Sequence, residues 1–155
     1  MTQRFILDEN VFIFAQLETD VGGEPDPTCL DLLQGILDIC HPIVFDPVLY
    51  GKIQHQLNHP AHQRRGFDSA ILRTLGQAIF RPGKLEYLEE SPPFAGETDI
   101  PQGSQDDKFI VWLAVESGAT LVTADEALRD DLASSSIQTR HGLNVLSPEG
   151  ALASL

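Results

Sequence analysis

Apolar and polar positions alternate along the chain in blocks that predict short strands separated by helices. Compact runs of apolar and β-branched residues predict strands at 4–8, 43–45, 85–88, 120–124 and 143–147. Apolar residues at helical spacing predict helices over 10–17, 29–40, 48–57, 67–80, 106–118 and 126–134, and a terminal turn or helix over 148–155. Because strands and helices alternate throughout, we expect an α/β fold, a three-layer α/β/α sandwich around a mainly parallel sheet.

Turn and cap residues mark where these elements begin and end. The segment 19–28 is rich in Gly, Pro and Asp and predicts a break, with Thr28 as the cap of the next helix. Asp46, followed by a proline, ends one strand and opens a helix. We expect a polar, basic connection over 58–66 and a long loop over 89–105. Loops of that length within compact domains are usually functional or mobile.

Two of the predicted strands run directly into carboxylates. The strand at 4–8 finishes on Asp8, and the strand at 120–124 leads through Thr123 to Asp125. In parallel sheets the ligand crevice lies beyond the carboxyl ends of the strands, where the strand order reverses. We therefore expect Asp8 and Asp125 to stand at the same edge of one sheet.

Length and composition are those of a folded globular domain, and we expect a single domain over residues 1–155. The chain is 42% hydrophobic and 21% charged. It holds no apolar run near the roughly 20 residues of a membrane span, and its N-terminus lacks the long apolar core of a secretory signal. Cys29 and Cys40 form neither a disulfide framework nor a zinc pattern. A cytoplasmic protein without membrane contact is the expectation.

The net charge of −13 argues against a broadly basic nucleic-acid-binding surface, because 10 basic residues face 23 acidic ones. Three readings remain open. The partner is not a polyanion, or the acids gather around a metal ion while a small basic face binds, or the acidity only keeps the protein soluble.

A third acid, Asp107, falls in the first turn of the helix predicted over 106–118. Taken alone, Asp106 or Asp107 is explained as a helix cap and Asp8 as a turn residue at a strand end. Brought together, three carboxylates repel one another unless a cation neutralises them. Oxygen-only ligands suit Mg²⁺ or Mn²⁺ better than Zn²⁺.

The motifs FILDENV and DDKFIVWLAVESGATLVTADEAL together resemble the PIN-domain family of metal-dependent ribonucleases. The family's motif positions are occupied here by Asp8 with Asn10, Asp107 with Ala114, and Thr123 with Asp125. The ending NVLSPEGAL also looks like the family's last strand and short helix, so the resemblance spans nearly the whole chain. It implies hydrolysis of RNA phosphodiester bonds with Mg²⁺ or Mn²⁺ as cofactor.

The resemblance also implies roles for individual residues. The catalytic, metal-holding residues would be Asp8, Asp107 and Asp125. Asn10 and Thr123 would orient the carboxylates through hydrogen bonds, as outer partners of metal ligands usually do. Asp106 is a lower-ranked helper.

Lys52 departs from the family pattern, which places a Glu early in the helix after the second strand. The matching stretch here is KIQHQL, so an ammonium stands at that position. Lys52 competes with a metal ion, contacts the substrate phosphate, or points into solvent, and Asp46 is a nearby acid that could replace the Glu. These alternatives stay open at the level of sequence.

The connection over 58–66 groups basic and imidazole side chains. They are His59, His62, Arg64 and Arg65, with Lys52 and His55 earlier on the preceding helix. Arg64 and Arg65 are the candidates for substrate binding on a local RNA-binding patch. A solvated connection without function is the other interpretation. Phe109 and Trp112, within an apolar helix, are expected in the core.

Other function classes remain in competition. FILDENV partly resembles the haloacid-dehalogenase-like phosphatases, although Asn10 replaces their second Asp and no Lys-led motif follows. A site altered by Lys52 could instead persist as a binding module. Many PIN-like proteins are toxins held by an antitoxin, so the resemblance implies an antitoxin partner as an option. Homodimers are common in the family, but this sequence does not indicate one.

Overall fold

The computed structural model describes residues 2–39, 41–63, 71, 73, 76–77, 83–90 and 100–155. Its centre is an all-parallel sheet in the order β3-β2-β1-β4-β5. The strands are β1 (Phe5–Leu7), β2 (Ile43–Phe45), β3 (Leu85–Tyr87), β4 (Thr120–Val122) and β5 (Val145–Leu146). The prediction of a three-layer α/β/α fold with a mainly parallel sheet is confirmed.

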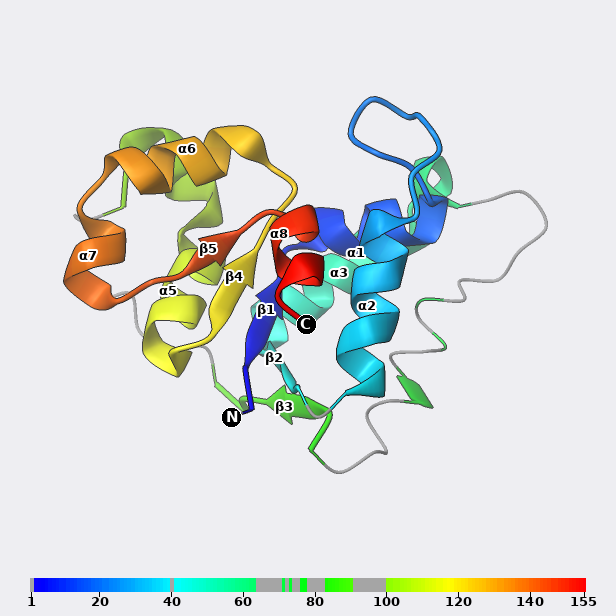
Figure 1. Cartoon of the computed structure of the whole chain (residues 1–155), viewed down its shortest axis with the longest axis horizontal. Coiled ribbons are helices and arrows are strands. Elements are labelled where there is room, and N and C mark those ends of the chain that lie inside the picture. The colour runs from blue at the N-terminus through cyan, green and yellow to red at the C-terminus, as the bar shows by residue number, and fades with distance from the viewer. Residues whose placement is uncertain are drawn as a thin grey trace.

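Helices connect each strand to the next. They are α1 (Glu9–Leu17), α2 (Thr28–Asp38), α3 (Pro47–Asn58), α5 (Lys108–Ser117), α6 (Glu126–Ser134), α7 (Ile137–His141) and α8 (Pro148–Ala153), with 3-10 turns η1 (Pro60–His62) and η3 (Gln102–Asp107). Parallel strands are joined by right-handed crossovers, so reversing the direction of strand addition moves the helices to the other face. Figure 1 shows this division, with α1, α2 and α3 on one side of β1 and β4 and with α5, α6 and α7 on the other.

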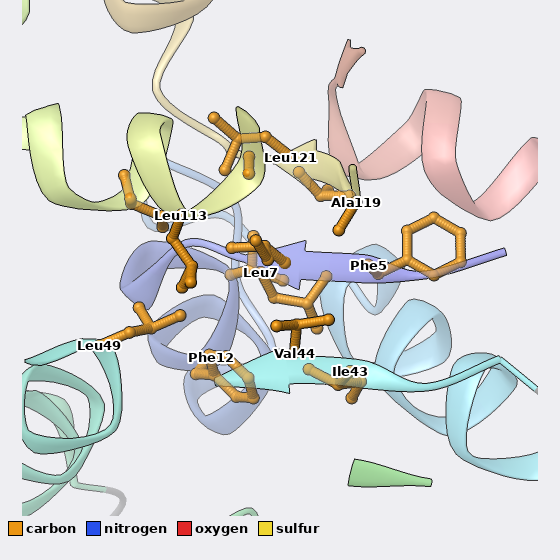
Figure 2. Packing of buried hydrophobic residues seen from close by; sticks show 14 of the residues in the cluster. Phe5, Leu7, Phe12, Ile43, Val44, Leu49, Leu113, Ala119 and Leu121 are labelled. Carbon is orange, nitrogen blue, oxygen red and sulfur yellow. The ribbon is translucent and has the colours of Figure 1, made fainter. Parts of the chain in front are cut away.

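The core lies along the three central strands. Every residue of β1, β2 and β4 is buried, as expected of parallel strands that are covered on both faces. Figure 2 shows Leu7, Val44 and Leu121 from these strands beside Phe12, Leu49 and Leu113 from the helices. A sheet packed in this way is a rigid base for the residues that follow each strand.

The start of α2 differs from the prediction that Thr28 caps a helix over 29–40. The helix already includes Thr28 and ends at Asp38, and the residue at the cap position makes no side-chain cap bond. Instead, Asp26 Oδ1 accepts hydrogen bonds from Thr28 N at 2.9 Å and from Thr28 Oγ1 at 2.6 Å. The Thr28 hydroxyl therefore donates to a carboxylate that the sequence pattern did not single out.

The segment before α5 also differs from its prediction. The helix expected over 106–118 begins only at Lys108, and the two acids before it belong to the 3-10 turn η3. This turn also occupies the end of the loop predicted over 89–105. Most of the helix predicted over 67–80 lies outside the described residues, as do Arg64 and Arg65. No helix in the described part of the chain is long and apolar enough to cross a membrane.

Candidate functional site at the carboxyl edge of the sheet

The carboxyl edge of the sheet reverses its strand order between β1 and β4. Strands β2 and β3 add to one side of β1, whereas β5 adds to the far side of β4. The register pairs Leu7 with Val122, and Asp8 N donates to the carbonyl of Val122 at 2.9 Å. The residues that follow the two strands, Asp8 and Thr123, are therefore neighbours, at the edge where the sequence predicts Asp8 and Asp125.

A hydrogen-bond network holds the Asp8 carboxylate. Its Oδ2 accepts from Thr123 Oγ1 at 2.7 Å and from Asn10 Nδ2 at 3.2 Å. Asn10 Oδ1 in turn accepts from Ala124 N at 3.1 Å, and Thr123 Oγ1 accepts from Asp125 N at 3.1 Å. Side chains and backbone from both strand ends thus fix the direction of one carboxylate.

Asp8 is buried, and its Oδ1 accepts from Glu9 N at 2.7 Å as the cap of α1. Only 5% of its surface is exposed, and burial is the main cause that raises the pKa of its carboxyl to about 6. The Thr123 hydroxyl lowers that pKa, whereas the charges of Asp107 and Glu9 raise it. Because Asp8 and Asp107 are 99 positions apart in the sequence, this mutual effect shows that the fold brings them near each other.

Asp107 stands at the N-cap position of α5, yet its side chain makes no cap hydrogen bond. The explanation of Asp107 as a helix cap is therefore wrong for its side chain. Burial raises the pKa of its carboxyl, the charge of Asp125 raises it further, and the charge of Lys52 lowers it. The charge of exposed Asp106 also raises it, with a smaller effect.

Asp125 does serve as a cap. Its Oδ1 accepts from Leu128 N at 3.1 Å at the start of α6, and the residue is exposed. Its charge nevertheless raises the pKa of Asp107. Asp107 thus lies within electrostatic range of both Asp8 and Asp125, and the Asp125 carboxylate caps α6 as well as acting on Asp107.

Asp46 is used elsewhere. It follows β2 as Asp8 follows β1, but it is 1% exposed and its Oδ1 accepts from Leu49 N at 2.7 Å as the cap of α3. Lys52, further along the same helix, carries its Nζ 4.0 Å from the centre of the Phe109 ring. Phe109 is half-buried and Trp112 is in the core.

The donor set fits the chemistry of a hard divalent cation, because all three candidate ligands are carboxylates and two of them have raised pKa values. The positions of the side chains do not form a finished site. In the described part of the chain, no group of three or more His, Cys, Asp or Glu side chains is close enough to hold one ion. A metal ion at this edge would require the carboxylates to draw together.

A pocket of about 540 Å³ adjoins the site. Asn10, Asp125 and Arg129 line it from the side of the acids, and residues of the 19–29 segment and the start of α8 complete it. Arg129 was not anticipated from the sequence. Its Nη1 donates to the carbonyl of Thr123 at 2.6 Å. No sequence pattern predicts this contact, because it joins a side chain of α6 to a backbone carbonyl that precedes the helix.

The histidines of the basic connection have local partners. His59 Nδ1 accepts from Ala61 N at 3.2 Å, and His62 Nδ1 lies 2.8 Å from the carbonyl of Gln56. Their rings lie 5.3 Å apart. Because Arg64 and Arg65 are outside the described residues, the predicted substrate-binding patch stays a prediction.

Neither a scan of protein-family models nor a search of curated proteins finds a match to this sequence. Among solved structures, the chain is similar to VapBC2 from Rickettsia felis bound to a DNA fragment from its promoter. The identity is 12%, the alignment covers 94% of this chain and 98% of that chain, and the TM-score is 0.48. It is also similar to a PilT N-terminus domain protein from the archaeon Sulfolobus solfataricus P2, with 14% identity, coverage of 98% and 92%, and a TM-score of 0.41.

Proposed function

We propose that this chain is a PIN-like, metal-dependent endoribonuclease that works at the carboxyl edge of its sheet. One observation carries the proposal. Asp107 lies within electrostatic range of both Asp8 and Asp125, which follow the two strands between which the strand order reverses. The motif resemblance supplies the substrate class, RNA, and the expectation of Mg²⁺ or Mn²⁺.

Asp8, Asp107 and Asp125 are the residues that would hold the ion. Bound Mg²⁺ or Mn²⁺ supplies a Lewis acid and an activated water molecule for attack on a phosphodiester. Asn10 and Thr123 keep Asp8 Oδ2 oriented by donating to it. A nearby cation favours the ionised form of a carboxyl, so ion binding would lower the raised pKa values of Asp8 and Asp107.

A binding module without catalysis is the second candidate. Two observations favour it: the ammonium of Lys52 already acts on Asp107, and no three-acid group among the described residues is ready to hold a metal. A partner protein covering the acids, such as the antitoxin of a toxin pair, would suit either candidate. An antitoxin and a homodimer both stay predictions from the motif resemblance.

A phosphatase of the haloacid-dehalogenase type is less favoured. Asn10 replaces the second acid of that motif, and both ends of its amide are occupied: Nδ2 donates to Asp8 and Oδ1 accepts from Ala124 N. This side chain orients its neighbours and offers no carboxyl that could protonate a leaving group.

The test is cleavage of RNA with added Mn²⁺ or Mg²⁺ by wild type, Asp8→Asn and Lys52→Glu. Asp31→Asn, on the exposed face of α2, removes one charge elsewhere and is the matched control. We expect cleavage by wild type and by Asp31→Asn and none by Asp8→Asn. Unchanged cleavage by Asp8→Asn would refute the assigned site, and cleavage only by Lys52→Glu would favour the binding module. A phosphomonoester substrate is assayed in parallel, because its hydrolysis would favour a phosphatase over a nuclease.

A further inference from the structure

Lys52 differs from the other basic side chains of the described chain in what surrounds its charge. Arg4, Lys84 and Arg129 each donate a hydrogen bond to a backbone carbonyl. Lys52 Nζ makes no hydrogen bond or ion pair with any described residue. Its N–H donors on the side away from any described partner are therefore open to a ligand.

Phe109 holds this ammonium in place. Lys52 Nζ lies 4.0 Å from the centre of the Phe109 ring, within the range of a favourable cation–π contact. Phe109 lies in the first turn of α5, two residues after Asp107. The ring covers one side of the ammonium, so the contact favours a position of the charge beside the acidic group and leaves the N–H donors on the other side for a ligand.

The ammonium is near Asp107 without pairing to it. The charge of Lys52 lowers the pKa of the Asp107 carboxyl, but the two groups form no ion pair. A group lying between them could therefore contact Lys52 directly. An anion between the two groups would contact the Lys52 ammonium on one side. On its other side would lie the carboxyl edge with the candidate metal ligands.

We propose that Lys52 binds a phosphate oxygen of the RNA substrate and so places the phosphodiester next to Asp107. The inference rests on the proposed function and names how its site attracts a polyanion to a chain of net charge −13. A lysine ammonium binds phosphate as a compact point charge. Phe109 is then a positioning residue, since it acts on the substrate only through Lys52.

The experiment compares Lys52→Met, which keeps the length of the side chain and removes its charge, with Lys52→Arg and with Lys84→Met. Lys84 donates to the Ile39 carbonyl before β3, so Lys84→Met makes the same charge change away from the carboxyl edge. Two quantities are measured: the Kd for a short labelled single-stranded RNA in EDTA over a range of salt, and KM and kcat for RNA cleavage with Mn²⁺.

For Lys52→Met we expect Kd and KM to rise about ten- to hundredfold, as for the loss of one charged hydrogen bond, with little change in kcat. The slope of log Kd against log salt should fall by about 0.7, the value for one phosphate contact on a single strand. Lys52→Arg should restore most of the binding, and Lys84→Met should match wild type. Phe109→Leu, which removes the aromatic face and retains an apolar side chain, should raise KM about two- to threefold.

The results separate the inference from the function on which it rests. Wild-type cleavage with unchanged Kd, KM and salt slope in Lys52→Met overturns the role of Lys52 alone. Higher cleavage by Lys52→Met at unchanged KM also overturns it, since the ammonium would then oppose metal binding. A wild-type protein that neither binds nor cleaves RNA overturns the proposed function and this inference together.

Discussion

The two ends of the sheet differ in how their charged side chains are paired. At the amino end, the Arg4 guanidinium makes two contacts with Glu86, one of them from Nε to Oε2 at 2.9 Å, and also donates to the Ser117 carbonyl. Lys84 donates to the Ile39 carbonyl at the same end. At the carboxyl end, Asp8 and Asp107 stand together with raised pKa values and without an ion pair.

This difference separates two kinds of residue. Arg4 and Lys84 at the amino end form contacts that stabilise the fold, whereas Asp8 and Asp107 at the carboxyl end are held by the fold in a destabilising arrangement. Clusters of groups with perturbed pKa values in a crevice are typical of functional sites. Proteins tolerate such local destabilisation where activity requires it. The amino end should therefore influence stability alone, and the carboxyl end should influence activity most.

After the complete loss of cleavage expected for Asp8→Asn, removing the Asp107 carboxylate should have the largest effect. Asp107→Asn should lower RNA cleavage about 10²- to 10³-fold, as expected for the loss of one electrostatic group at a reacting centre. Asp106→Asn is the matched control, because this exposed neighbour carries the same charge and has the smaller effect on the site. Initial cleavage rates with saturating Mn²⁺ are the measurement. Equal losses in the two variants would contradict the special position of Asp107.

The pH dependence of stability should report Asp8 directly. Because the folded-state pKa is raised from 3.8 to about 6, the folded protein binds the proton more tightly than the unfolded chain does. This contribution to stability is fully present below pH 4 and is lost as pH rises through 6. The raised pKa corresponds to about 3 kcal/mol between these limits. Urea unfolding in EDTA at pH 4, 5, 6 and 7 measures it.

Asp8→Asn should flatten this part of the pH profile, since an amide does not titrate. Added Mn²⁺ should flatten it in wild type as well, because a cation beside the carboxylate favours its ionised form. If the free energy of unfolding changes from pH 4 to pH 7 to the same extent in wild type and in Asp8→Asn, the ionised Asp8 carboxyl is not destabilised by its surroundings.

Thr123→Val should have an intermediate effect. The substitution removes the hydroxyl that donates to Asp8 Oδ2 and accepts from Asp125 N, while the volume is kept. Loss of such an outer partner typically costs about 10- to 100-fold in metal affinity or activity. Titration of cleavage with Mn²⁺ measures it, and Thr139→Val on α7, where the hydroxyl bonds only to the Ser136 carbonyl, is the control. Identical Mn²⁺ requirements in both variants would count against an orienting role.

Arg4→Met should have the smallest effect and should act on stability alone. The pair with Glu86 is about one-third exposed on each side, which places its contribution near 1 kcal/mol. Urea unfolding at pH 7 measures this loss, and kcat and KM for RNA should match wild type. A fall in kcat would break the contrast between the two ends of the sheet.

The sequence by itself determined the order of strands and helices and the arrival of carboxylates at the ends of β1 and β4. These features follow from local rules, because hydrophobic periodicity reports which face of each element is buried. It also predicted the parallel sheet, and parallel pairing brings Asp8 and Thr123 to one edge. The family motifs added Asn10, which the structure joins to both.

Only the tertiary structure decided which partners the polar and charged side chains have. Hydrogen bonds between side chains depend on distances that no local pattern contains, so the sequence could not show that Asp26 takes the Thr28 hydroxyl or that Asp107 leaves its helix uncapped. The place of Lys52 is of the same kind. Its stretch of sequence left three roles open, and the packing of α3 beside α5 put its ammonium over Phe109 and near Asp107. Electrostatic energy depends on separation in space, and the fold alone sets that separation.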